Sequence, residues 1–244
     1  MATTTASIPR ATTARRPYVG LAVLAALIAI VGFWPTYFGP LVAGTVDKTA
    51  IIHVHAAVYV GWLAIFVTQA ALAATGRVAL HIKLGRFAIG YGVLVIAVGL
   101  ITAFARFALR VRAGEATAAQ AQLLGPLLDM LVFAPLFAAA VYYRRMPDVH
   151  KRLMIVATTA LLIAAATRMP IVGGPSGRVL LLHLIWTAPI LLAMGHDFWR
   201  QRKVHPVYVL GLVILVLEGP LGRTPARQSQ LWMDASGWLV TWVT

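Results

Sequence analysis

The chain alternates long runs of apolar residues with short polar segments that are mostly basic. A helix needs about 20 apolar residues to cross roughly 30 Å of hydrocarbon. Seven runs approach this length, so we predict an all-α polytopic transmembrane helical bundle of about seven helices. The predicted spans are 18–35, 50–74, 86–108, 121–143, 152–170, 178–197 and 205–219. The seventh is short, with Pro206 at its start and Glu218-Gly219-Pro220 at its end, and is either a tilted span or a re-entrant segment.

The two ends of the chain differ from the predicted bundle, 18–220. Residues 1–17 form a polar, basic tail, and the apolar run after it exceeds the ~7–15 residues of a signal-peptide core. We therefore expect an uncleaved first helix. Residues 221–244 form a C-terminal interfacial segment, in which 231–244 predicts an amphipathic helix with a tryptophan-rich face.

Composition supports a membrane protein. Hydrophobic residues make up 60% of the chain and charged residues 11%, against about 45–50% and 25% in soluble domains. The net charge of +14 does not indicate a nucleic-acid partner, because the basic residues lie in clusters between apolar runs. The absence of cysteine excludes disulfides, iron–sulfur clusters, thiolate zinc sites and c-type haem attachment.

The distribution of basic residues predicts an orientation. Thirteen of the 21 Lys and Arg residues fall in segments on the same side as the N-terminus, which the positive-inside rule assigns to the cytoplasm. We expect a multi-pass protein of the bacterial inner membrane. Its expected partner is the lipid bilayer, and a membrane-protein partner or a second copy of the chain stays open.

Ionisable residues inside the predicted spans are candidates for function, because each costs roughly 2.5–3.5 kcal/mol on insertion. His55, Asp129, His183 and Glu218 fall at similar depth near the outer ends of their helices. Two histidines and two carboxylates suit a divalent metal. The alternatives are interfacial histidines and a structural ion pair of Asp129. The predicted charge partners are Arg106 and Arg168, which otherwise snorkel to headgroups.

A histidine recurs where new helices begin on the predicted inner side, with a valine shortly before it. These residues are His81, His150 and His205. Each follows a helix with an ionisable residue near its outer end, so three similar helical hairpins are one hypothesis. The inner histidines either hold topology and bind lipid headgroups or contact a haem, a quinone headgroup or a cytoplasmic partner.

Three segments carry a family resemblance: 52–62 (IHVHAAVYVGW), 76–86 (GRVALHIKLGR) and 150–154 (HKRLM). Over residues 30–205 the chain resembles a family of uncharacterised bacterial multi-pass inner-membrane proteins with His-x-x-Leu-Gly and His-Lys-Arg-Leu-Met motifs. That resemblance implies a fold and no activity.

More distantly, the chain resembles the b-type cytochromes that hold two haems between four helices. This resemblance implies one haem between His55 and His183 and an inner haem between His81 and His150. Small residues would then adjoin the macrocycles, and the spans supply four glycines for this role: Gly61, Gly90, Gly92 and Gly99.

Three functions follow as hypotheses. The first is a redox or metal-binding protein, with b-type haem or a divalent metal as cofactor. The second is a small-molecule or proton-coupled transporter that uses Asp129, His55 and His183. The third is a scaffold without chemistry of its own. The sequence contains no clear pair of broken helices, which disfavours transport. It also has no nucleotide-binding loop and no nucleophile–base constellation, so catalytic residues stay unknown and enzyme activity is undecided.

Overall fold

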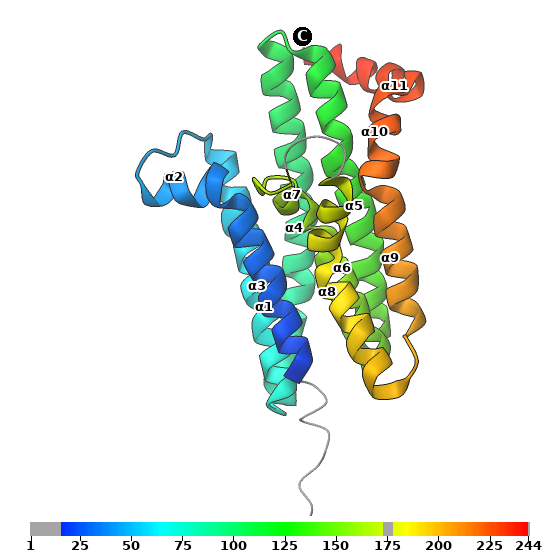
Figure 1. The fold of residues 1–244 in the computed structure, drawn as a ribbon. Coiled ribbons are helices and arrows are strands. Elements are labelled where there is room, and N and C mark those ends of the chain that lie inside the picture. The colour runs from blue at the N-terminus through cyan, green and yellow to red at the C-terminus, as the bar shows by residue number, and fades with distance from the viewer. Residues whose placement is uncertain (1–15, 173–177, 244) are drawn as a thin grey trace, which may run out of the picture.

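The computed structural model describes residues 16–172 and 178–243, and this part of the chain is folded into helices. The predicted all-α class is therefore confirmed (Figure 1). The helices are α1 (Arg16–Phe33), η2 (Trp34–Phe38), α2 (Gly39–Val42), α3 (Ala50–Ala74), α4 (Val78–Arg112), α5 (Ala116–Tyr142), η3 (Tyr143–Arg145), α6 (Pro147–Ala160), α7 (Ile163–Ala166), α8 (Arg178–Gln201), α9 (Pro206–Glu218), α10 (Pro220–Gln228) and α11 (Gln230–Val240).

Seven segments of the described part are long and apolar enough to cross a membrane, which makes this a multi-pass membrane protein. They are Arg16–Val42, Ala50–Ala74, Val78–Arg112, Ala116–Arg145, Pro147–Ala166, Val179–Gln201 and Pro206–Gln228. Each contains most or all of a predicted run. The seventh is longer than predicted, because α10 continues it to Gln228.

The turns between helices follow from local chemistry. Gly76 and Gly114 adopt positive φ values of 73° and 81° just after α3 and α4, a conformation that side chains disfavour and that ends a helix. Pro147 begins α6, where its missing N–H costs nothing. These stops set up tight antiparallel hairpins of α3 with α4, α4 with α5 and α5 with α6.

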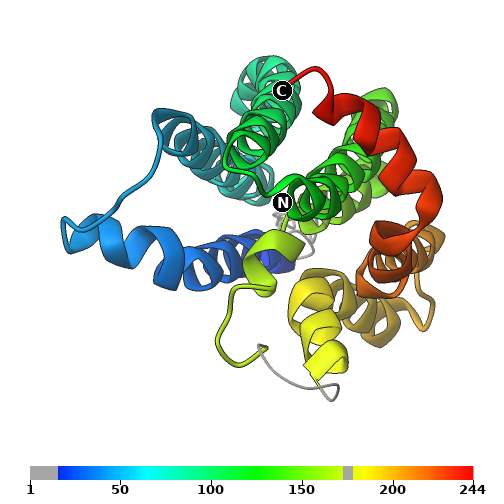
Figure 2. The same ribbon diagram turned by 90° about the horizontal axis from the view of Figure 1, so that it is seen from above.

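The span of α6 and α7 lies at the centre of the bundle and is mostly buried, whereas the other spans expose most of their surface. Helices α1, α5, α8 and α9 pack against it, as the view from above illustrates (Figure 2). Between α3 and α5, the ring of Trp62 packs edge-on against Phe133 and Phe137, with centroids 5.5 and 5.4 Å apart. Close packing of this kind holds the helices together in lipid, where hydrophobic burial adds little.

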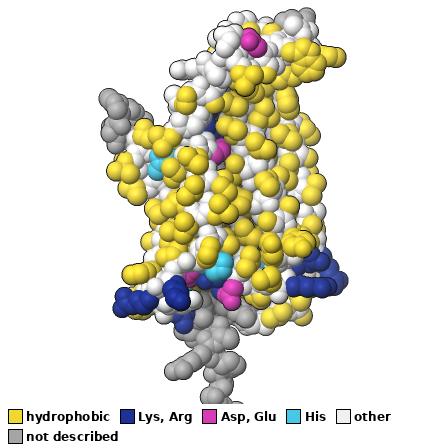
Figure 3. Space-filling view, turned by 90° about the vertical axis from the view of Figure 1, so that its right-hand side faces the viewer, with side chains coloured by type: hydrophobic (Ala, Val, Ile, Leu, Met, Phe, Trp, Pro, Cys, Tyr) yellow, Lys and Arg dark blue, Asp and Glu magenta, His cyan; other side chains and the backbone are white. Residues whose placement is uncertain are grey.

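The surface has an apolar middle and one basic end. Hydrophobic side chains cover the middle of the face in Figure 3, and Lys and Arg side chains gather at its lower end. We call this lower end, where α4 and α6 begin, the basic end. The opposite end carries α11 and is called the α11 end (Figure 1). In the predicted orientation the basic end is cytoplasmic.

Two of the seven spans are interrupted. The fifth span breaks between α6 and α7, where Leu161 and Leu162 form a turn. The seventh span breaks at Gly219, whose extended backbone (φ −65°, ψ −157°) separates α9 from α10. Both breaks lie in the half of the bundle toward the α11 end. The sequence did not predict them as a pair.

Candidate ligand cavity

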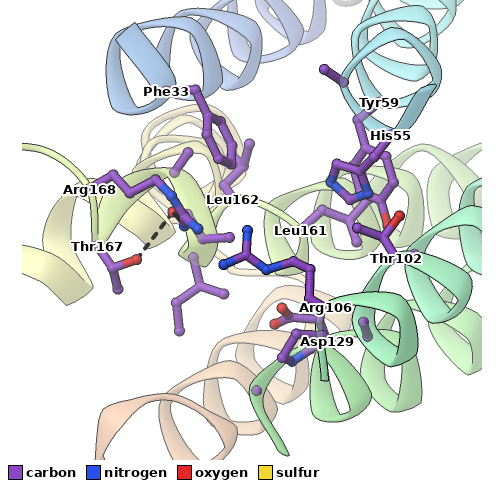
Figure 4. A pocket seen from close by; sticks show the side chains of 18 of the residues that line it. Phe33, His55, Tyr59, Thr102, Arg106, Asp129, Leu161, Leu162, Thr167 and Arg168 are labelled. Atoms are coloured by element: carbon purple, nitrogen blue, oxygen red, sulfur yellow. Dashed lines mark hydrogen bonds between the residues drawn. The ribbon is translucent and has the colours of Figure 1, made fainter. Parts of the chain in front are cut away.

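A cavity of about 660 Å³ opens among α1, α3, α4, α5, α7 and α10, in the half toward the α11 end. Its walls are mostly apolar, with Phe33, Leu161 and Leu162 among the lining residues in Figure 4. Polar groups converge on it from all sides. A cavity of roughly 300–1,000 Å³ with apolar walls and a few convergent polar groups is typical of a small-molecule site.

The cavity is strongly cationic. Its basic lining residues are Lys48, Arg106, Arg110, Arg168, Arg223 and Arg227. Asp129 is the acidic residue among the described residues that line it. Arg110 also pairs with Glu115 at the rim, 3.3 Å away. The basic side chains therefore outnumber the acidic ones around this space.

The carboxylate of Asp129 forms an ion pair with Arg223, which also binds Glu218. All three side chains are at least 87% buried. The predicted partners, Arg106 and Arg168, form no ion pair with Asp129, and this part of the prediction is corrected. The reason is the restart of the helix at Pro220, which returns Arg223 toward α5.

Gly125 gives the arginines of α10 room against α5. A Cβ atom at this position would lie 2.8 Å from Nη2 of Arg227 and 3.5 Å from Nη1 of Arg223. A larger side chain would therefore displace one or both guanidinium groups. The Nε atom of Arg227 is buried without a hydrogen-bond partner among the described residues.

Arg106 and Arg168 approach the cavity from opposite sides, and their guanidinium groups point into the same space (Figure 4). Arg168 donates a hydrogen bond to the carbonyl of Ala164 and lies over the ring of Phe33, 4.9 Å from its centroid. Arg168 is an exposed residue.

His55 lines the cavity from α3 and stacks on Tyr59, with ring centroids 4.1 Å apart. Its Nδ1 atom is buried and has no hydrogen-bond partner among the described residues. The neighbouring His53 instead accepts or donates a hydrogen bond at Nδ1 with the hydroxyl of Tyr37, 2.9 Å away. Among the described residues, His55 is the histidine that lines the cavity.

The predicted metal layer is not assembled. Within residues 16–172 and 178–243, no group of three or more His, Asp or Glu side chains is placed to hold a metal ion. Asp129 and Glu218 do come together, but both carboxylates bind the guanidinium of Arg223. His183 donates from Nδ1 to the carbonyl of Val179, 2.7 Å away, and does not line the cavity. Its Nε2 atom is buried without a partner in the described structure.

The glycines expected beside a haem are mostly filled by neighbouring side chains. A Cβ atom would meet the Tyr91 hydroxyl at Gly61, the Phe137 ring at Gly92, and Tyr59 with Met130 at Gly99. These notches serve helix packing, because small residues let bulky neighbours approach the backbone. Gly90 has open space around it.

His81 and His150 lie together at the basic end, with ring centroids 6.5 Å apart. The Nδ1 atom of His81 donates to the carbonyl of Gln69 (3.3 Å), and that of His150 to the carbonyl of Ala140 (2.8 Å). Each histidine therefore ties the start of its helix to the preceding helix. His205 differs, because its Nδ1 accepts from the N–H of Val207 and caps its own helix.

One buried ion pair was missed by the sequence analysis. Arg152 of α6 donates from Nε and Nη2 to Oδ2 of Asp197 in α8, at 3.0 and 2.8 Å. Both side chains are 3% exposed. Arg152 is the first residue of the predicted span 152–170, beside Lys151, and nothing in the sequence around it indicates a partner 45 residues away.

No protein-family model, curated protein or solved structure matches this chain. The cavity and its charges therefore carry the functional argument.

Proposed function

We propose that this chain is a small-molecule-binding protein of the bacterial inner membrane, with its N-terminus in the cytoplasm, and that the cavity is its binding site. The cavity carries the proposal, because about 660 Å³ of space with apolar walls and convergent polar groups is large enough for an organic ligand. The resemblance to uncharacterised bacterial multi-pass proteins is consistent with this localisation.

The interrupted spans favour transport as the purpose of this binding. Leu161 and Leu162 at the first break, and Pro220 at the second, all line the cavity. In transporters, discontinuous helices commonly surround the substrate, because irregular backbone is tolerated at membrane depth where it adjoins a cavity. Breaks placed elsewhere in the bundle would not support this role.

The test compares two neighbouring alanines on α3. Ala56 lines the cavity, whereas Ala57 faces away from the bundle and does not. Tryptophan at position 56 fills part of the cavity, and tryptophan at position 57 adds the same bulk on the outer surface. Each variant and the wild type are purified in lipid nanodiscs, and bound small molecules are extracted and identified by mass spectrometry.

We expect a molecule that co-purifies with the wild type and with Ala57→Trp and is depleted at least tenfold in Ala56→Trp. Equal recovery from all three proteins would contradict the proposal. A size-exclusion profile and a melting curve for each variant separate loss of the ligand from loss of the fold.

A second candidate function, metal or haem binding, is favoured by the histidine pair at the basic end. Both Nδ1 atoms donate to carbonyls, which leaves Nε2 as the ring nitrogen of His81 and His150 for a metal, an arrangement common in metal-ligating histidines. The test is the visible spectrum of oxidised and dithionite-reduced protein, together with metal analysis. Absorbance or metal that persists in His81→Ala/His150→Ala would contradict this assignment.

A further inference from the structure

Arg106 and Arg168 have no acidic partner across the cavity they share. Neither forms an ion pair with a described residue, and Arg106 also makes no hydrogen bond to one. Their guanidinium groups nonetheless point toward the same space (Figure 4). Two like charges that face each other in a membrane bundle are costly unless something neutralises them.

The acidic residues nearby are already used. Asp129 and Glu218 share Arg223, and Glu115 pairs with Arg110. The lining residues Lys48, Arg106, Arg168 and Arg227 form no ion pair among the described residues. The protein therefore supplies an excess of positive charge that its own carboxylates do not balance.

We propose that Arg106 and Arg168 hold the anionic group of the cavity's ligand, and that this group is a phosphate or a carboxylate. The proposal rests on the proposed function and names the ligand class for the same site. A guanidinium presents N–H donors in a planar fork that matches the oxygens of both groups. The apolar walls around Phe33 and Leu162 then receive the organic part of the ligand.

The position of His55 adds a third polar contact. It lines the same cavity, and its Nδ1 atom is buried without a partner. In Figure 4 its ring projects from α3 toward the space between the two arginines. The site thus contains two fixed cations and one imidazole against a largely apolar wall.

The probes are inorganic phosphate, sodium acetate and dihexanoyl phosphatidic acid, with dihexanoyl phosphatidylcholine as a zwitterionic comparison. Binding to the protein in phosphatidylcholine nanodiscs is measured by calorimetry. The variants are Arg106→Gln, Arg168→Gln and the double variant. Arg112→Gln is the matched control, because Arg112 is an exposed arginine of α4 that does not line the cavity.

We expect at least one anionic probe to bind the wild type and Arg112→Gln equally. Each single cavity variant should weaken binding about 10- to 100-fold, the range of one lost charged hydrogen-bonding group. Binding of phosphate or acetate alone identifies a free anion as the source, and binding of phosphatidic acid alone identifies a lipid headgroup. Either result supports the proposal.

Wild-type affinity in the double variant, equal losses in Arg112→Gln, or no binding of any anionic probe would overturn it. The failure of the anion proposal is distinguishable from failure of the proposed function. A co-purifying molecule that Ala56→Trp removes but Arg106→Gln/Arg168→Gln retains would keep the cavity as a binding site and refute its anion specificity. Melting curves for all variants identify any that fail to fold.

Discussion

The buried pair of Arg152 and Asp197 predicts a strongly non-additive response to mutation. Arg152→Met leaves the carboxylate of Asp197, 3% exposed, without its guanidinium partner. Asp197→Leu leaves the buried guanidinium of Arg152 with one remaining ion pair, to Asp148 at 3.4 Å. Arg152→Met should cost about 3–5 kcal/mol of unfolding free energy, because a buried carboxylate stays behind without its partner. Asp197→Leu should cost less than Arg152→Met, because Asp148 still pairs with Arg152. The double variant replaces both charges with apolar groups and should cost less than about 2 kcal/mol.

The assay is equilibrium unfolding in mixed micelles, with the fluorescence of buried Trp186 among the signals. The control is Lys151→Met, which removes a 2.5 Å pair with Asp148, a side chain that is 77% exposed. That variant should lose less than about 1 kcal/mol. A double variant that costs as much as the two single variants together would refute the reasoning, because it would mean that the two charges do not stabilise each other.

Three further outcomes are expected. Arg223→Gln should lower the unfolding free energy by about 3–5 kcal/mol in the same assay, because it leaves two buried carboxylates together; wild-type stability would contradict this. Gly32→Ala should destabilise the protein by about 1–3 kcal/mol, because the new Cβ atom would clash with the backbone of Ala165. Gly90→Ala is the control and should be neutral or stabilising, because a Cβ atom there has nothing within 4 Å. Burial, and then Arg152, lowers the pKa of His205 below its ordinary 6.5. Folding therefore favours the neutral ring. Its contribution to the free energy of unfolding is complete above about pH 6.5 and declines as the pH falls toward the pKa of His205 in the folded protein. His205→Asn should keep the cap and flatten the stability profile below about pH 6.5; an unchanged slope would contradict this.

The apolar pattern was sufficient to predict the seven spans, because each needs only length and hydropathy. The continuation of the seventh was missed. Glu218-Gly219-Pro220 was interpreted as the end of a helix, but proline also suits the first position of a new one. That restart supplies Arg223 and Arg227 to the cavity, so the error in the span became an error in the partner of Asp129.

The glycines show a different limit of sequence reasoning. A glycine in a span indicates close approach of something bulky, but the sequence does not say what approaches. At Gly92 the neighbour is the ring of Phe137, 45 positions along the chain, and at Gly61 it is the hydroxyl of Tyr91. The sequence likewise does not reveal the cavity, because its lining residues come from many helices whose relative placement only the folded chain contains.

The ion pair between Asp129 and Arg223 joins residues that are 94 positions apart. At a synthesis rate of roughly 5–20 residues per second, α5 is made about 5–20 s before its arginine partner. During that interval the carboxylate of Asp129 enters the membrane without the partner that it has in the finished protein. The last helices therefore complete the charge balance of a bundle whose core is already synthesised. A chain that ends before Arg223 would therefore keep the carboxylate of Asp129 without its ion-pair partner.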